Sequence, residues 1–285
     1  MAVGDSPSPP APILFLPVPV HTLPMDLLIV GAGDMGRWFG RTVDADLAFA
    51  DSDPERATAV ADDLGGRAVP LDGDEQFDVV CLAVPMRLAA EAVEANAHRA
   101  TAAMCDVTGA MAAPIAAMRD HLDGQERLSL HPLFAPQNGP GNVAAVRAES
   151  GPLTDAILSD LETAGNHVFE TTPAEHDGAM ETVQSAAHAA VLAFGLAAED
   201  VRDEFATPIS AALDELVASV SSGTPRVYTD IQSAFGGGTE RVADAARALE
   251  MADEETFADL YRAVARENGI ETELEGETDK HDPVE

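Results

Sequence analysis

Apolar residues in this chain fall into short runs, separated by stretches whose apolar positions recur with helical spacing. The runs DLLIV, DLAFA, DVVCLAV and AAMCDV each precede such a stretch. Strands this short and this uniformly apolar are typical of a parallel sheet covered by helices on both faces. The pattern predicts an α/β fold, a doubly wound and mostly parallel sheet of the Rossmann type.

The pattern changes after Thr172. The segment PAEHDGAMETVQSAAHAAVLAFGLAAEDV has one continuous helical pattern, opened by Thr172 as N-cap and by Pro173. Further helices are predicted over residues 209–220, 224–233, 239–251 and 254–268. We therefore expect an α/β domain over residues 25–172 and an all-helical domain over 173–270. Residues 1–24 are expected to be a disordered extension or a misassigned start, and 271–285 an acidic tail.

The chain is strongly acidic, with 50 acidic and 16 basic residues and a formal net charge of -34. This charge argues against nucleic acid or an anionic membrane surface as a partner. The acids occur throughout the chain, which predicts a halophilic protein, as from a halophilic archaeon, with a cytoplasmic location. No apolar stretch is long enough for a membrane span. Cys81 and Cys105 lie inside apolar runs and are expected to be buried free thiols.

The first predicted strand is followed by the glycine motif GAGDMG, residues 31–36. In such a motif Gly31 forms the tight turn, Gly33 lets the backbone approach a pyrophosphate, and Gly36 permits close packing of helix on strand. The free amides of the following helix, which starts near Asp34 and Met35, then bind phosphate. Because the motif lies between a strand and a helix, it predicts a dinucleotide site.

The type of dinucleotide is indicated at the end of the second predicted strand. Asp51 lies about twenty residues beyond Gly31, where a carboxylate accepts hydrogen bonds from ribose hydroxyls and repels a 2′-phosphate. Asp53 is a rival for this role, and Asp51 could instead cap the next helix. NAD is therefore favoured over NADP. Val84 and Pro85, at the exit of a later strand, are expected to lie against the nicotinamide half of the cofactor.

A histidine in the segment HPLFAP, His131, is the main candidate for chemistry. With GAGDMG, DVTGAM and TTPAEHDGAMETVQSAAHAAVLAFG, this segment makes the chain resemble the prephenate dehydrogenase family over nearly all of residues 25–285. The resemblance implies NAD-dependent oxidative decarboxylation of prephenate to 4-hydroxyphenylpyruvate in tyrosine biosynthesis. It also implies that His131 is catalytic and draws off the proton of the 4-hydroxyl group.

The resemblance also implies that the helix after Thr172 lines the substrate, with Gln184 and His188 as contacts. The sequence departs from the family pattern at three positions, where Gly109, Met111 and Ala211 replace a serine, a lysine and an arginine. Thr108 is the nearest hydroxyl to replace the serine. The cation expected for the substrate carboxylates is Arg226, with Arg87 and Arg202 as further candidates, and no metal site is expected.

Other functions remain open at this stage. An arogenate dehydrogenase, an NADP-linked imine or pyrroline reductase, and a non-catalytic dinucleotide-binding regulator all fit part of the pattern. Residues 173–270 contain more apolar helical surface than one layer can bury against the α/β domain, which predicts a homodimer.

Overall fold

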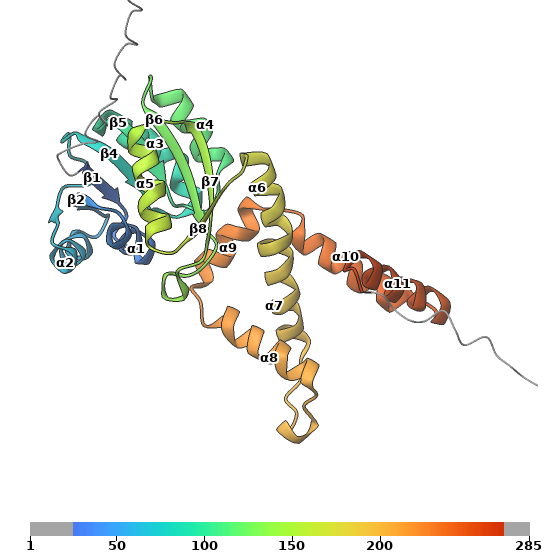
Figure 1. Ribbon diagram of the computed structural model, residues 1–285. Helices are drawn as coiled ribbons and strands as arrows, with labels where there is room; N and C mark the ends of the chain where they lie inside the picture. The colour runs from blue at the N-terminus through green and yellow to red at the C-terminus, as the bar shows by residue number, and fades with distance from the viewer. Residues whose placement is uncertain (1–24, 271–285) are drawn as a thin grey trace, which may run out of the picture.

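The computed structural model describes residues 25–270, and its N-terminal part contains one eight-stranded sheet (Figure 1). The strand order is β3-β2-β1-β4-β5-β6-β7-β8. The predictions for residues 1–24 and 271–285 lie outside the described residues. The strands are β1 (Met25–Val30), β2 (Ala45–Ala50), β3 (Arg67–Ala68), β4 (Phe77–Leu82), β5 (Ala100–Asp106), β6 (Glu126–Pro132), β7 (Asn142–Glu149) and β8 (His167–Glu170).

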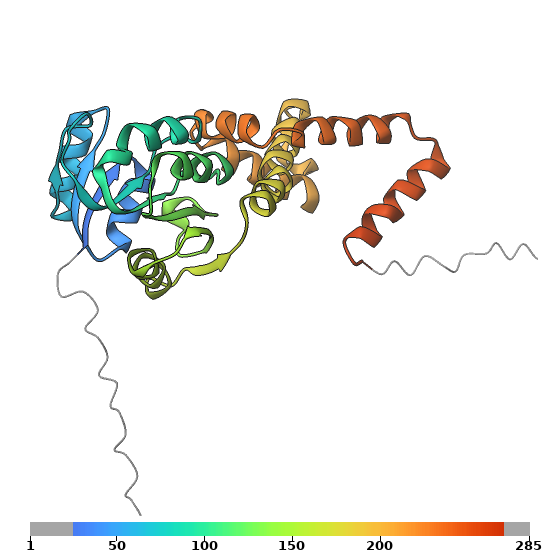
Figure 2. The ribbon, with the colours of Figure 1, turned by 90° about the horizontal axis from the view of Figure 1, so that it is seen from above.

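The sheet is buried on both faces, as the uniformly apolar strands predict. Leu27 and Ile29 of β1 contribute to one apolar core, and Leu28 and Val30 contribute to the other. Side chains of α1, α2 and α5 pack into the first core, and side chains of α3 and α4 into the second. Figure 2 shows α3 and α4 on one side of the sheet and α5 on the other. The bounds are α1 (Asp34–Thr42), α2 (Pro54–Leu64), α3 (Ala89–Asn96), α4 (Ala112–His121) and α5 (Pro152–Thr163).

Strand direction confirms the doubly wound, mostly parallel sheet. β1 pairs in parallel with both β2 and β4, so the chain reverses its direction of winding between β1 and β4. The exceptions are β7, which runs antiparallel to β6, and β8, which runs parallel to β7. In open α/β sheets, ligands bind at such a reversal point beyond the carboxyl ends of the strands. The GAGDMG motif lies there, directly after β1.

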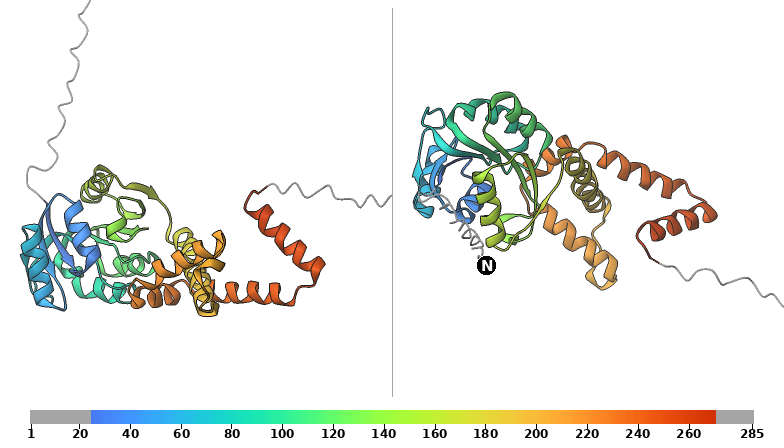
Figure 3. Two further views of the ribbon diagram at one scale, coloured as in Figure 1. Left: turned by 90° about the horizontal axis from the view of Figure 1, so that it is seen from below. Right: turned by 45° about the horizontal axis from the view of Figure 1, so that its top comes forward.

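Residues 173–270 are mostly helical and extend away from the sheet (Figure 3). Its helices are α6 (Pro173–Met180), a π-helical segment (Glu181–Ala186), α7 (Ala187–Ala197), α8 (Pro208–Ser221), α9 (Pro225–Ala234), α10 (Gly238–Met251) and α11 (Glu254–Glu267). The prediction of one regular helix from Pro173 to Val201 was wrong in two respects: the helix is widened by the π-helical segment, and it ends at Ala197.

Candidate active site

The glycine motif forms a tight turn against the exit of β4. Gly31 has a φ of 106°, and a Cβ there would overlap the carbonyl oxygen of Ala83. A Cβ on Gly36 would overlap the carbonyl oxygen of Gly31. Only glycine fits these two positions, because a left-handed backbone and close backbone contacts exclude a side chain.

The N-terminus of α1 presents an open backbone surface. Gly33 is its N-cap, has no side chain to bond the first amides, and has no atom within 4 Å of the position of a Cβ. The first-turn amides, which include those of Asp34 and Met35, therefore have no side-chain cap. Free amides and the helix dipole are the groups that hold a pyrophosphate, so this surface fits a dinucleotide.

Asp51 braces the glycine turn from the end of β2. Its carboxylate accepts hydrogen bonds from the amide of Ala32 at 2.7 Å and from the amide of Asp53 at 2.9 Å. The cap of α2 is Asp53, whose Oδ1 accepts from the amides of Glu55 and Arg56. The structure thus assigns the helix-capping role to Asp53 and leaves Asp51 beside the glycine motif. The Arg56 guanidinium lies 3.9 Å from each of the two carboxylates.

Val84 and Pro85 lie at the exit of β4, next to the glycine turn. The position of a Cβ on Gly31 would be 3.4 Å from the amide nitrogen of Val84. An ion pair ties this exit to the helical part of the chain. Arg87, just after Pro85, donates to both carboxylate oxygens of Asp230 on α9, at 3.0 and 3.1 Å. The β4 exit is therefore held between the glycine turn and α9.

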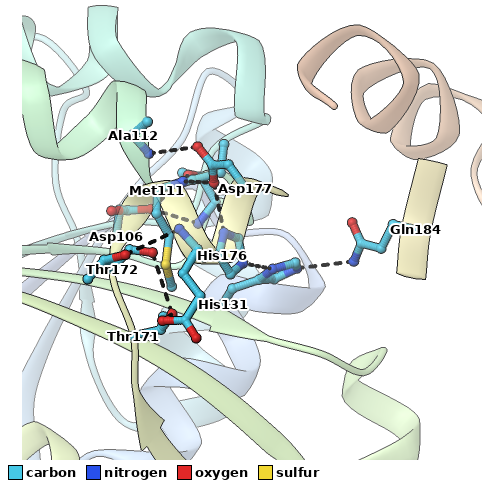
Figure 4. Close-up of polar contacts among 12 residues, drawn as sticks. Asp106, Met111, Ala112, His131, Thr171, Thr172, His176, Asp177 and Gln184 are labelled. Carbon is cyan, nitrogen blue, oxygen red and sulfur yellow. Dashed lines mark hydrogen bonds and ion pairs between the residues drawn. The ribbon is translucent and has the colours of Figure 1, made fainter. Parts of the chain in front are cut away.

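His131 lies near the end of β6 and is buried. Its Nδ1 is 2.8 Å from Nε2 of His176, and Nδ1 of His176 is 2.7 Å from Oδ1 of Asp177 (Figure 4). Asp177 in turn accepts from the amides of Met111 and Ala112, at 3.3 and 3.2 Å. A chain of hydrogen bonds therefore runs from the start of α4 through α6 to the end of β6.

This chain fixes the positions of the ring protons. Two amides donate to Asp177, so its carboxylate is an acceptor and Nδ1 of His176 donates to it. Nε2 of His176 is then an acceptor, and Nδ1 of His131 donates to it. Nε2 of His131 consequently carries a lone pair and can accept a proton or a hydrogen bond.

The pKa values of His131 and Asp177 keep both groups in the protonation states that this chain of hydrogen bonds requires. Burial, followed by the neighbouring His176, lowers the pKa of His131 to about 3. For Asp177, burial raises the pKa, but the hydrogen bonds from His176 and from two backbone amides outweigh it, and the pKa is lowered. At neutral pH the imidazole of His131 is therefore neutral and the carboxylate of Asp177 is ionised.

Two further groups lie at the free nitrogen of His131. Nε2 of Gln184 is 3.4 Å away, and Oε1 of Gln184 is buried without a hydrogen-bond partner. Gly109, with a φ of 93°, approaches from the loop after β5, and a Cβ there would lie 3.2 Å from Nε2 of His131. The structure thus brings the predicted residues His131 and Gln184 together.

The predicted residues Thr108 and His188 have other partners. The hydroxyl of Thr108 donates to Oδ1 of Asp106 at 2.7 Å. Burial raises the pKa of Asp106 to about 6, against the lowering effect of the bonds from Thr108. The ring of His188 packs edge-on against Tyr228 at 4.9 Å between centroids, and its Nδ1 is buried without a partner.

The predicted carboxylate-binding arginines are not joined to the histidines. Within residues 25–270, no hydrogen bond or ion pair connects an arginine to His131 or His176. Arg226 is exposed on α9, Arg87 is paired with Asp230, and Arg202 lies over the ring of Phe205. In the same range, no cluster of three or more histidine, cysteine or acidic side chains is arranged to hold a metal. None of the described helices is long and apolar enough to cross a membrane.

Sequence reasoning did not assign roles to His176 and Asp177. They stand next to each other in the segment EHD, at the first turns of α6. Their adjacency could have suggested an oriented imidazole, but the sequence does not show that α6 packs against the end of β6.

Three comparisons place the chain among known proteins. The family described as "Prephenate dehydrogenase, nucleotide-binding domain" matches residues 41–172. A 4-amino-4-deoxyprephenate dehydrogenase of Streptomyces pristinaespiralis is 37% identical over 220 residues, which are 69% of this chain and 73% of that protein.

The fold is similar to solved structures of the same group. Prephenate dehydrogenase from Aquifex aeolicus, solved with hydroxyphenyl propionate and NAD+, has a TM-score of 0.65 and 17% identity, over 88% of this chain and 100% of that chain. Arogenate dehydrogenase from Synechocystis has a TM-score of 0.62 and 17% identity, over 86% of this chain and 98% of that chain.

Proposed function

The chain belongs to the prephenate dehydrogenase family, and on that premise we propose that it catalyses the NAD-dependent oxidative decarboxylation of prephenate. The observation that carries the proposal is the lone pair on Nε2 of His131, which Asp177 fixes through His176 and which, among the described residues, only the amide nitrogen of Gln184 faces, at 3.4 Å. A reaction that removes a hydride from a carbon bearing a hydroxyl group needs an acceptor of this kind beside that group.

The proposed reaction balances without a net proton. A hydride leaves ring carbon 4, the bond from ring carbon 1 to its carboxylate breaks, and the electron pair of that bond enters the ring. The products are CO2, the aromatic 4-hydroxyphenylpyruvate and the reduced cofactor. Nε2 of His131 accepts a hydrogen bond from the 4-hydroxyl, which increases electron donation from oxygen to carbon 4 as the hydride departs.

The residues of the glycine turn fit the cofactor. A bound nicotinamide dinucleotide supplies the hydride acceptor. The first-turn amides of α1 behind Gly33 would hold its pyrophosphate, and Val84 and Pro85 would lie against its nicotinamide half. We propose NAD and not NADP, because two carboxylates, those of Asp51 and Asp53, stand at the end of β2 and repel a 2′-phosphate, whereas the one cation beside them among the described residues, Arg56, lies 3.9 Å from each.

A second candidate substrate is 4-amino-4-deoxyprephenate, the compound named for the Streptomyces relative. It differs from prephenate by an amino group in place of the hydroxyl at ring carbon 4, and the same electron flow converts it to an aromatic amine. The unpartnered Oε1 of Gln184 favours it, because rotation of the Gln184 amide, whose nitrogen lies 3.4 Å from Nε2 of His131, would present this oxygen as a second acceptor.

We propose that residues 173–270 form a substrate and dimerisation domain. None of the eleven residues of α7 is buried, and Leu196 is 89% exposed. Phe205 and Ile209, on the following segments, are also exposed. Burying such a surface stabilises a pair of subunits, so a homodimer is expected. Light scattering in molar salt tests this: a monomer at micromolar concentration would contradict it.

The first test of the function is the appearance of reduced nicotinamide on mixing the protein with NAD and prephenate in molar potassium chloride. A His131→Asn variant should lose activity by about 10²- to 10⁴-fold, because it lacks the base, while it still binds the dinucleotide. If neither prephenate nor its 4-amino analogue yields reduced nicotinamide, although dinucleotide binds, the proposed function is wrong.

A further inference from the structure

Gln184 lies on the π-helical segment, which is fixed by a neighbouring helix. The hydroxyl of Ser185 donates to Oε1 of Gln232 at 3.0 Å, and Nε2 of Gln232 donates to the carbonyl of Ser185 at 2.9 Å. Gly238 at the start of α10 also packs on this segment, so closely that a Cβ would strike Ser185. π-helical turns of this kind are frequent at functional sites. The backbone that carries Gln184 is therefore held firmly beside His131.

The orientation of the Gln184 amide follows from the ring protons of His131. Because Nε2 of His131 carries a lone pair, the group facing it at 3.4 Å must be the amide nitrogen, which donates. The amide oxygen is then turned away, and it is buried without a partner. A buried carbonyl oxygen without a hydrogen bond is costly, so a donor supplied by a ligand would stabilise it.

The loop after β5 leaves the space at Nε2 of His131 free of a side chain. Gly109 approaches this nitrogen, and even a methyl group there would lie 3.2 Å from it. The neighbouring hydroxyl, that of Thr108, donates to Asp106 instead. A substituent on the substrate that reaches this space therefore meets Nε2 of His131, and rotation of the Gln184 amide would turn its unpartnered Oε1 toward the same substituent.

We infer that Gln184 is a specificity-determining residue that distinguishes the substituents on the reacting ring carbon. Its amide oxygen favours an amino group over a hydroxyl group. A neutral amino group has two hydrogens, one for Nε2 of His131 and one for Oε1 of Gln184. A hydroxyl group has one hydrogen and leaves Oε1 unpaired. Both N–H groups are then hydrogen-bonded, and the nitrogen lone pair remains available to donate electrons to the ring. The inference rests on the proposed function.

The test is the ratio of kcat/KM for the 4-amino substrate to kcat/KM for prephenate. Gln184→Met keeps the length of the side chain and removes the acceptor, so the ratio should fall by about ten- to hundredfold. Gln184→Glu keeps an acceptor and should hold the ratio at or above the wild-type value. Val183→Ala, at the exposed neighbouring position, is the matched control and should leave the ratio unchanged.

The ratio separates specificity from general damage, because a loosened helix would slow both substrates together. A ratio that stays within about threefold of wild type in Gln184→Met would overturn the inference and leave the proposed function standing. A ratio that falls equally in Gln184→Glu would also overturn it. A wild-type protein inactive on both substrates would refute the proposed function and this inference with it.

Discussion

Asp177 is predicted to control catalysis although it does not face the space where substrate binds. In the structure Oδ1 of Asp177 accepts from the amide of Met111 and from Nδ1 of His176, and Oδ2 accepts from the amide of Ala112. In an Asp177→Asn variant the one remaining oxygen keeps the place of Oδ1, so the ring protons stay where they are, but the negative charge is lost and the amide of Ala112 faces an amide nitrogen. Nε2 of His176 then becomes a weaker acceptor for Nδ1 of His131, and Nε2 of His131 a weaker acceptor for the substrate.

The magnitude follows from the bonds involved. The 2.7 Å bond between His176 and Asp177 is charge-assisted, a type that contributes about 1.5–3 kcal/mol, or about ten- to a hundredfold in rate. A loss of about ten- to a hundredfold in kcat is therefore expected. Dinucleotide affinity should not change, because α1 and the glycine turn are untouched.

The assay is initial-rate formation of reduced nicotinamide at saturating substrate, together with thermal unfolding. Asp177 also bonds the first amides of α4, so the variant should lose about 1 kcal/mol of stability. Asp253→Asn is the matched control, because Asp253 caps α11 through the amide of Thr256 and lies far along the chain from the histidines. If Asp177→Asn retains kcat within about threefold of wild type while it is folded, the contribution of the Asp177 charge to catalysis is refuted.

Three further outcomes are expected. Gly109→Ala should lower both the melting temperature and kcat/KM, because alanine is strained at a φ of 93° and its methyl group would press on His131. Unchanged values would show that the loop after β5 moves to accommodate the methyl group. Asp51→Ala should weaken dinucleotide binding, measured by fluorescence titration, by about tenfold or more, because the amide of Ala32 in the glycine turn loses its acceptor. Unaltered affinity would show that Asp51 does not contribute to the dinucleotide site. The pKa of His131 is lowered from 6.5 to about 3, so the unfolded chain binds a proton that the folded chain does not between these pH values. The free energy of unfolding therefore falls as the pH falls from 6.5 toward 3, by about 1.4 kcal/mol per pH unit at most. In urea unfolding, the free energy of unfolding of His131→Gln should fall less steeply with decreasing pH than that of wild type.

The candidate site shows where prediction from sequence stopped. The resemblance implied that His131, in the segment HPLFAP, and Gln184, on the helix after Thr172, belong to the site. It did not predict their hydrogen-bond partners. Thr108 and His188 stay predictions as substrate contacts; the hydroxyl of Thr108 bonds the nearby Asp106, and the ring of His188 packs against Tyr228. The contacts of His131 with His176 and of His188 with Tyr228 join segments distant in sequence, which local patterns do not predict.

Local sequence determined the α/β class, the positions of most strands and helices, and the glycine turn. These features depend on residues within a few positions of each other: apolar runs buried on both faces of a sheet, helix caps, and glycines that alone tolerate a left-handed backbone or close contact. For the same reason Gly31 and Gly36 could be assigned before any coordinates were known.

Tertiary structure alone decided which ring nitrogen of His131 is free. That result needs α6 to place His176 against the end of β6, and the start of α4 to orient Asp177 with two amides. It also needs the π-helical segment, which regular helical spacing does not predict, to set Gln184 beside the free nitrogen. Hydrogen bonds act over about 3 Å, whereas the residues they join here are up to 66 positions apart in the chain, so only the packed fold brings them within reach.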